Sequence, residues 1–240
     1  MSCPMPPQDL HRPRRSLPAL ALAGALASCA SGPPPPDWQM NAHTALDRAV
    51  AAYLAGDARV ADAEFERAQG ELSRTGRADL LARAALLRCA AQVASLAQLP
   101  CTGFEPYRAD APAAERAYAA YLAGQAGQAS PADSALLPPA QQAVALAAAG
   151  AAADAALGAI SDPVSRLVAA GVLLQTGRAS PATITLAAET ASAQGWRRPL
   201  LAWLGVQAQR AEAAGASDEA ARVRRRIAWV LGLAGAAAHP

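Results

Sequence analysis

The amino-acid sequence predicts an all-α protein, and three observations support this prediction. Apolar residues recur at spacings of three and four in several segments, which places them on one face of a helix. Three prolines directly follow a residue whose side chain can cap a helix, an arrangement typical of a helix start. No stretch alternates apolar and polar residues with the β-branched and aromatic content of a strand. We therefore expect roughly nine to eleven helices with short connections.

The first 28 residues have the layout of an export signal. Arg12, Arg14 and Arg15 precede an uncharged run, residues 16–27, which is apolar almost throughout and ends in small residues. This order of charged, apolar and small residues is typical of a cleaved signal peptide. The apolar run has about a dozen residues, whereas a helix needs roughly 20 to cross a bilayer. We therefore expect residues 1–28 to be removed.

The residues at the expected cleavage site, Leu26-Ala27-Ser28-Cys29, resemble the lipobox of bacterial lipoproteins in all four positions. In that family the cysteine thiol receives a diacylglyceryl group, and the signal is cut just before it. The resemblance implies that Cys29 anchors the chain to a membrane. In lipoproteins of this kind an aspartate after the cysteine favours the inner membrane. Because Ala30 stands there, the resemblance implies the outer membrane and its periplasmic side. An ordinary signal peptide with a chance cysteine is the alternative.

A proline-rich tether is expected after Cys29, over residues 29–41. Four consecutive prolines, 33–36, favour an extended polyproline II conformation over a helix. No comparable linker interrupts the remaining chain, so we expect one helical domain over residues 42–235. The last five residues, 236–240, are expected to form a flexible tail.

Five apolar stripes and three start signals locate the helices within this domain. The first stripe ends at Gly56, a residue that commonly terminates helices. The start signals are Ser130-Pro131, Asp162-Pro163 and Ser180-Pro181. The stripes are Leu46, Ala49, Val50, Tyr53 and Leu54; Leu80, Ala84, Leu87, Ala91 and Ala94; Val164, Leu167, Val168, Gly171 and Val172; Leu200, Leu201, Leu204 and Ala208; and Ala220, Val223, Ile227, Val230 and Leu231.

An internal repeat makes the architecture more specific. Residues 46–56 read LDRAVAAYLAG and residues 114–124 read AERAYAAYLAG, so eight of eleven positions are identical. Asp47 also matches Glu115 in charge. The offset of 68 residues is twice the ~34-residue period of the tetratricopeptide repeat, a stacked helix-turn-helix unit.

A second pattern supports this resemblance. Gly56, Ala61, Phe65 and Ala68 match the spacing of the small turn residue and of the alanine, aromatic and alanine in the second helix of that family. The residues from 46 to 68 thus resemble a tetratricopeptide unit. The resemblance implies antiparallel helix pairs stacked into a superhelix. Weaker matches to the same pattern begin at Gly177 and Gly215. An irregular helical bundle is the alternative.

Two cysteines remain for a disulfide if the signal is removed and Cys29 carries lipid. In an oxidising compartment Cys89 and Cys101 are expected to pair. Cys89 lies in a segment expected to be helical to about Ala97, and the extended residues that follow can return along that helix to bring Cys101 close. Two unpaired thiols, one of them a small buried apolar group, are the alternative.

The net charge does not indicate a nucleic-acid partner. Three of the 21 arginines and one of the 19 acidic residues belong to residues 1–28, which leaves 18 of each in the expected mature chain. A balanced chain lacks the basic excess with which proteins bind phosphate backbones. We therefore expect no nucleic-acid partner.

Catalytic and metal-binding patterns are absent from the sequence. His43 and His239 are the histidines that follow the signal, and neither has a second histidine or a cysteine at metal-ligand spacing. No phosphate-binding loop, dinucleotide fingerprint or nucleophile elbow occurs. The sequence thus predicts a protein that is not an enzyme, with no cofactor and no metal.

Two groups of residues near the C-terminus are candidates for binding. Arg222, Arg224, Arg225 and Arg226 could contact a partner or a lipid headgroup, although a solvated helix face is the simpler interpretation. Trp196, Trp203 and Trp229 could belong to the core or to a peptide-binding patch.

These observations together predict a membrane-anchored periplasmic scaffold that binds another protein in envelope assembly, secretion or pilus formation. Repeat superhelices bind peptides or helices in a concave groove, through side chains that vary without disturbing the fold. The alternative is a regulator or enzyme of cell-wall metabolism. A carrier of small ligands would need a sizeable apolar cavity, which alanine-rich packing disfavours.

Overall fold

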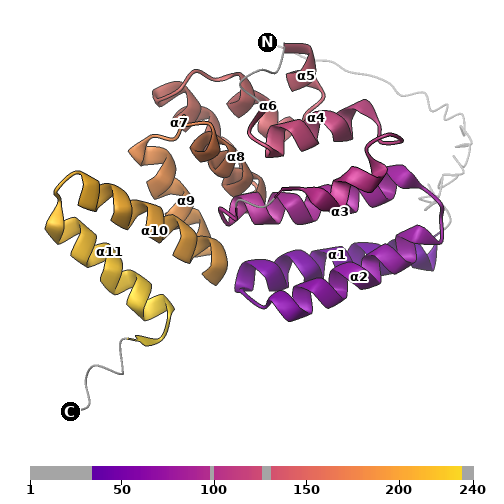
Figure 1. The fold of residues 1–240 in the computed structure, drawn as a ribbon, viewed down its shortest axis with the longest axis horizontal. Coiled ribbons are helices and arrows are strands. Elements are labelled where there is room, and N and C mark those ends of the chain that lie inside the picture. Colours follow the sequence, from indigo (N-terminus) through magenta and orange to yellow (C-terminus); the bar gives the residue numbers. More distant parts are fainter. Residues whose placement is uncertain (1–33, 98–99, 126–130, 234–240) are drawn as a thin grey trace, which may run out of the picture. The chain divides into compact units, whose positions relative to one another are not determined.

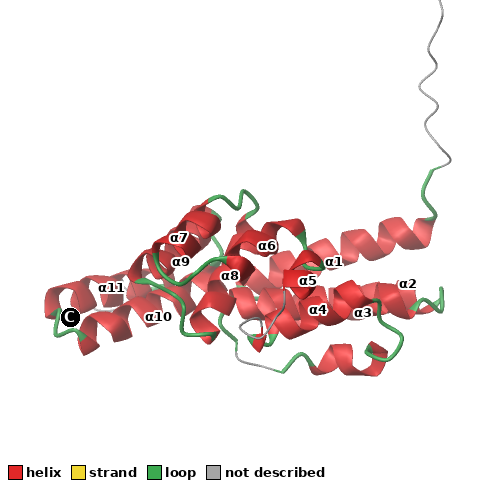
Figure 2. Ribbon diagram, turned by 90° about the horizontal axis from the view of Figure 1, so that it is seen from above, coloured by secondary structure: helices red, strands yellow, loops and turns green. Residues whose placement is uncertain are grey.

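The computed structural model describes residues 34–97, 100–125 and 131–233. Within these ranges all regular structure is helical and no strand occurs, which confirms the all-α prediction (Figures 1 and 2). All the helices belong to one compact unit, Pro35–Pro240. The expected signal peptide, Cys29, Ser130 and the tail 236–240 lie outside the described residues.

Eleven α-helices and one 3₁₀ helix, η1, occur in the described ranges. Their bounds are α1 (Asp37–Ala55), α2 (Ala58–Ser73), α3 (Ala78–Ala94), η1 (Thr102–Tyr107), α4 (Ala113–Leu122), α5 (Pro131–Ala135), α6 (Pro139–Leu146), α7 (Ala151–Gly158), α8 (Pro163–Gln175), α9 (Pro181–Ala193), α10 (Arg197–Ala213) and α11 (Ser217–Val230).

The first helix begins earlier than the sequence analysis places it. α1 starts at Asp37, inside the range 29–41 that we expected to be tether. Pro36 precedes the helix with extended backbone angles, and its carbonyl oxygen accepts a hydrogen bond from the Gln39 amide at 2.9 Å. An acidic side chain in the first turn, here Asp37, interacts favourably with the helix dipole. The last proline of the run therefore marks the start of the helix.

The α1–α2 hairpin has the helix-turn-helix form that the tetratricopeptide resemblance implies. Gly56 ends α1 with a left-handed φ of 102°, and the Asp57 side chain accepts a hydrogen bond from the Val60 amide at 3.0 Å to start α2. The antiparallel pair is visible in Figure 1. Ala61, Phe65 and Ala68 are all buried on α2. These small and aromatic side chains let the two helices approach closely.

Pairing of successive helices returns in the C-terminal half, where α8 packs on α9, α9 on α10 and α10 on α11 (Figure 1). The arrangement is helical-repeat-like, but its period is irregular. Gly124 has a positive φ just after the C-cap of α4, as Gly56 does at the C-cap of α1, yet the next described helix, α5, has only five residues. The alanine-rich residues 139–158 likewise form two short helices, α6 and α7.

The main core lies where α3 and α8 cross. Gly171 allows this approach, because a Cβ atom built there would lie 2.5 Å from the Val93 carbonyl oxygen. The fully buried Trp203 of α10 joins the same region, since its indole Nε1 donates a hydrogen bond to the Ala94 carbonyl oxygen at 3.1 Å. Helices distant in sequence thus meet at the end of α3.

Two of the three expected start signals lie within the described residues, and both cap helices. The Asp162 carboxylate accepts from the Ser165 amide at 2.7 Å at the start of α8, and the Ser180 hydroxyl accepts from the Thr183 amide at 3.1 Å at the start of α9. Each cap satisfies an amide that has no partner within its helix.

The expected disulfide is present in the structure. Cys89 and Cys101 are bonded, with Cα atoms 5.5 Å apart, in the range usual for disulfides. α3 ends at Ala94, a little before the expected end near Ala97, and the chain returns through η1 along the same helix. The bridge therefore holds this connection against α3.

Candidate functional site

Two pockets with mainly apolar walls, each of about 350 Å³, share part of their lining. The Glu115 pocket lies beside α3 and α4, and its lining includes Arg83, Leu86, Leu136 and Leu137. The Trp196 pocket lies among α1, α3, α4 and the start of α8, and its lining includes Asp47, Val50, Leu54, Asp162, Val164 and Trp196. Leu87 and Tyr118 line both pockets. We call the two pockets together the groove.

The first apolar stripe supplies one wall of the groove. Leu54 is buried in the core, whereas Val50 on the same helix remains half-buried and lines the Trp196 pocket. When the apolar face of a helix is broad, the side chains along one edge can pack in the core while those along the other edge line a binding surface. The stripe was predictable from the sequence, whereas the exposure of one of its edges on a pocket was not.

The internal repeat places equivalent residues on the same groove. Val50 and Tyr118 are related by the 68-residue offset, and both line the Trp196 pocket. Asp47 and Glu115 are related by the same offset, and they line the Trp196 and Glu115 pockets respectively. The repeat therefore contained a signal for the site. Trp196 was named only within the group of tryptophans, and Leu87 only as part of a stripe.

Glu115 is a buried carboxylate on the groove. Its side chain is 7% exposed, and its Oε1 accepts a hydrogen bond from Arg83 Nε at 2.5 Å. Its Oε2 is buried and has no hydrogen-bond donor among the described residues. Burying an acceptor without a donor is unfavourable, so this position would be stabilised by a donor from a bound molecule.

Tyr118 contributes an aromatic surface to both pockets. Its ring stacks beside that of Tyr121 with centroids 6.2 Å apart, and burial raises the pKa of the Tyr118 phenol well above its ordinary value. The side chain is therefore neutral at physiological pH. It offers the groove an apolar face, while Tyr121 donates a hydrogen bond to Gln141 Oε1 at 2.8 Å within the core.

The repeat-packing residues border a small cavity that shares Val50 and Leu87 with the Trp196 pocket. Phe65 lies under the Arg88 guanidinium, whose Cζ is 4.9 Å from the ring centroid, and Arg88 also pairs with Asp62 at 2.6 Å. The cavity beside Ala61 and Phe65 has a volume of about 20 Å³. A space of that size holds about one water molecule. Ala61, Phe65 and Ala68 thus contribute to packing.

The C-terminal arginines and tryptophans do not converge on one site. Arg222 pairs with Glu219, and Arg224 pairs with Glu212 at 2.7 Å. Arg225 and Arg226 form no ion pair with any described residue. Trp203 is fully buried, Trp196 is half-buried on the groove, and Trp229 is 62% exposed. The three tryptophans therefore differ in environment, although they are close in sequence.

Within the part of the chain that the structure describes, no three metal-binding side chains cluster. His43 is exposed and lies 3.4 Å from Asp47, one turn along α1. His239 lies outside the described residues. No helix among the described residues has both the length and the hydropathy needed to span a membrane.

Comparison with known proteins gives no match. No protein-family model, no curated protein and no solved structure corresponds to this chain.

Proposed function

We propose that this protein is a lipid-anchored scaffold of the bacterial envelope and that it binds a segment of a partner protein in the groove. The observation that carries the proposal is the pair of adjoining apolar pockets that share Leu87 and Tyr118. Binding sites are characteristically concave and mostly apolar, with a few well-placed polar groups. The groove has this composition, since Asp47, Glu115 and Asp162 stand among apolar and aromatic side chains.

The shape of the groove favours a chain segment as its occupant. Its lining comes from α1, α3, α4, the connection between α5 and α6, the start of α8 and the residue before α10, so no single helix forms the site. Two depressions of about 350 Å³ that share lining residues suit successive side chains of a peptide or helix. In envelope assembly, secretion or pilus formation, such a scaffold would hold its partner close to the membrane.

The anchor is proposed from the lipobox resemblance at Leu26-Ala27-Ser28-Cys29. If Cys29 is replaced by serine, no thioether can form, so labelled palmitate should no longer enter the protein. The precursor should then stay uncut or yield a soluble chain. Palmitate labelling that persists in Cys29→Ser would refute the anchor while leaving the groove proposal intact.

Partner binding is tested by site-specific photocrosslinking in the native bacterium. A photoreactive residue at Val50, on the wall of the groove, should give discrete crosslinked products. The same residue at Val60, which is 40% exposed on α2 and lines neither pocket of the groove, is the matched control. The proposal fails if Val50 gives no product, or only the products that Val60 gives.

A blocking variant makes this test sharper. Ala51 is exposed and lines the Trp196 pocket, so Ala51→Trp should fill the pocket without disturbing the core. Ala55→Trp places the same side chain on an exposed position of α1 that lines neither pocket. We expect the crosslink from Val50 to decrease in the first variant and to persist in the second.

A further inference from the structure

We propose that the segment bound in the groove carries an arginine or lysine side chain, which inserts its cation into the Trp196 pocket against Asp47 and Asp162. This inference rests on the proposed function, because it specifies the chemistry of the partner that the groove accepts. It follows from the charges, the aromatic side chains and the apolar surface that line the pocket.

The charges of the Trp196 pocket are all negative. Asp47 and Asp162 line it, and no arginine does. One oxygen of Asp162 accepts from the Ser165 amide at 2.7 Å, and the carboxylate forms no ion pair with any described residue. The ion-pair partner of Asp47 within the described ranges is the exposed His43 at 3.4 Å. Both carboxylates can therefore interact with a cation from a partner.

The aromatic and aliphatic lining suits the rest of such a side chain. Trp196 and Tyr118 provide ring surfaces, and Val50, Leu54 and Val164 provide apolar contacts. Arginine and lysine carry an apolar stem below the charge, and their cations bind favourably to aromatic faces. A neutral apolar side chain could contact these walls, but it would gain no attraction from the two carboxylates.

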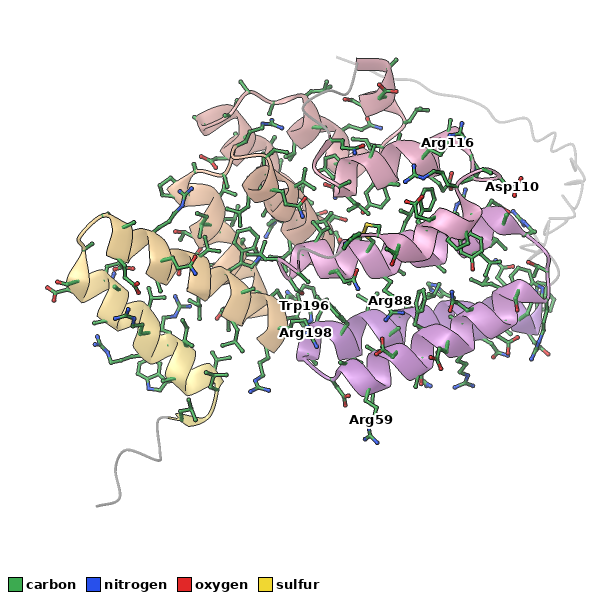
Figure 3. The ribbon with its side chains drawn as sticks, in the orientation of Figure 1. Arg59, Arg88, Asp110, Arg116, Trp196 and Arg198 are labelled. Atoms are coloured by element: carbon green, nitrogen blue, oxygen red, sulfur yellow. A yellow bond between two sulfur atoms is a disulfide. The ribbon has the colours of Figure 1, made fainter. Side chains whose placement is uncertain are left out.

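The fold already contains the same contact between arginine and an aromatic ring. The Arg198 Cζ lies 4.3 Å from the centroid of Tyr53, and Arg108 lies 5.0 Å from that of Phe104. Figure 3 shows Arg198 and Trp196 close together at the start of α10. Arg198 forms a hydrogen bond with the Tyr53 carbonyl oxygen of α1 and does not line the Trp196 pocket.

The Glu115 pocket is balanced in charge, because its carboxylate is paired with Arg83, so the net negative charge of the groove comes from the Trp196 pocket. Glu115 is largely buried there, and Arg83 occupies one of its two oxygens. The other oxygen lacks a donor among the described residues. Three carboxylates therefore line the groove against a single arginine. An acidic segment would be repelled, whereas a basic segment with apolar neighbours is complementary to the groove.

The test measures binding of short fluorescent peptides to the full-length chain, purified from its native envelope into nanodiscs of a zwitterionic lipid. The peptides consist of leucine and serine and differ at one central residue. That residue is arginine, its neutral isostere citrulline, or glutamate. We expect the arginine peptide to bind roughly tenfold more tightly than the citrulline peptide, and the glutamate peptide to bind most weakly. Added salt should reduce the difference.

A double variant assigns the preference to the pocket. Asp47→Asn with Asp162→Asn removes both charges, and asparagine at position 162 can still cap α8. We expect this protein to bind the arginine and citrulline peptides equally. Asp110→Asn with Asp218→Asn is the matched control, because it changes the net charge by the same amount at exposed residues that line neither pocket. It should retain the preference for arginine.

Three outcomes would overturn the inference: equal binding of arginine and citrulline peptides to the wild type, a preference that survives in the Asp47/Asp162 variant, or no binding of any peptide. The proposed function is tested separately by crosslinking from Val50. A Val50 crosslink together with equal peptide affinities would retain the groove as a protein-binding site and reject the basic side chain. Absence of the crosslink would reject the scaffold itself.

Discussion

Arg198 joins the first turn of α10 to the end of α1 through Tyr53. Its Nε donates a hydrogen bond to the Tyr53 carbonyl oxygen at 2.7 Å, and its guanidinium Cζ lies 4.3 Å from the centroid of the Tyr53 ring. The two residues are 145 positions apart in the chain. One side chain therefore connects the N-terminal hairpin to the C-terminal helices, beside the groove residue Trp196.

Removing this connection should destabilise the fold. Arg198→Ala loses both the charged hydrogen bond and the contact with the ring, and we expect a loss of about 1 to 3 kcal/mol in the free energy of unfolding. The neighbouring Arg197 is exposed and has no partner among the described residues, so Arg197→Ala should change stability by less than about 0.5 kcal/mol. Urea denaturation of both variants makes the comparison. Equal midpoints would mean that the Arg198 contacts do not contribute to stability.

Two glycine substitutions should have opposite signs. At Gly171 an added Cβ would lie 2.5 Å from the Val93 carbonyl oxygen, so Gly171→Ala must separate α3 from α8 and should cost about 1 to 3 kcal/mol. At Gly205, within α10, nothing lies within 4 Å of the added atom. There Gly205→Ala should stabilise the helix by up to about 1 kcal/mol. Thermal melts compare them, and a stabilising Gly171→Ala would contradict the close approach at the helix crossing.

The tetratricopeptide-like hairpin is tested on α2. Ala61 is 5% exposed and borders a cavity of only about 20 Å³, so Ala61→Leu should overpack the hairpin and cost roughly 1 to 3 kcal/mol. Ala58 is exposed in the first turn of the same helix. Ala58→Leu should cost less, because leucine is a good helix former. If Ala61→Leu melts at the wild-type temperature, the packing role of Ala61 is wrong.

Stability should decrease at alkaline pH because Tyr118 is buried in its neutral form. Burial raises the pKa of its phenol above the ordinary 10.0, so the folded chain keeps a proton that the unfolded chain releases. The stabilising contribution is therefore complete below pH 10.0 and is lost as the pH rises above it. Tyr118→Phe cannot ionise and removes no hydrogen bond that the described structure contains.

The measurement is urea denaturation at a series of pH values on either side of the tyrosine range. Wild type and Tyr118→Phe should have similar stability at neutral pH, and the variant should lose less of it on the alkaline side. Parallel pH profiles for the two proteins would show that Tyr118 ionises in the folded state as easily as in the unfolded state.

Features encoded by neighbouring residues were predictable from the sequence. The left-handed turn at Gly56 and the caps at Asp162 and Ser180 each depend on contacts within about one helical turn, so their local patterns were sufficient. The Cys89–Cys101 disulfide also closes a short segment, with a sequence separation of 12. Local periodicity likewise placed most of the helices.

Only the tertiary structure determined which side of each apolar face is buried in the core and which remains accessible. Val50 and Leu54 belong to one stripe and both line the Trp196 pocket, yet Leu54 is fully buried and Val50 only half-buried, because the neighbouring helices cover the two sides of α1 to different extents. The same holds for Trp203 in the core, Trp196 on the groove and Trp229 in solvent. The sequence by itself determined where helices start, turn and end, since those contacts are local. Packing decided which residues 68 positions apart line one pocket and which residues 145 positions apart form a hydrogen bond, because helical periodicity identifies the apolar face of a helix and not its partner.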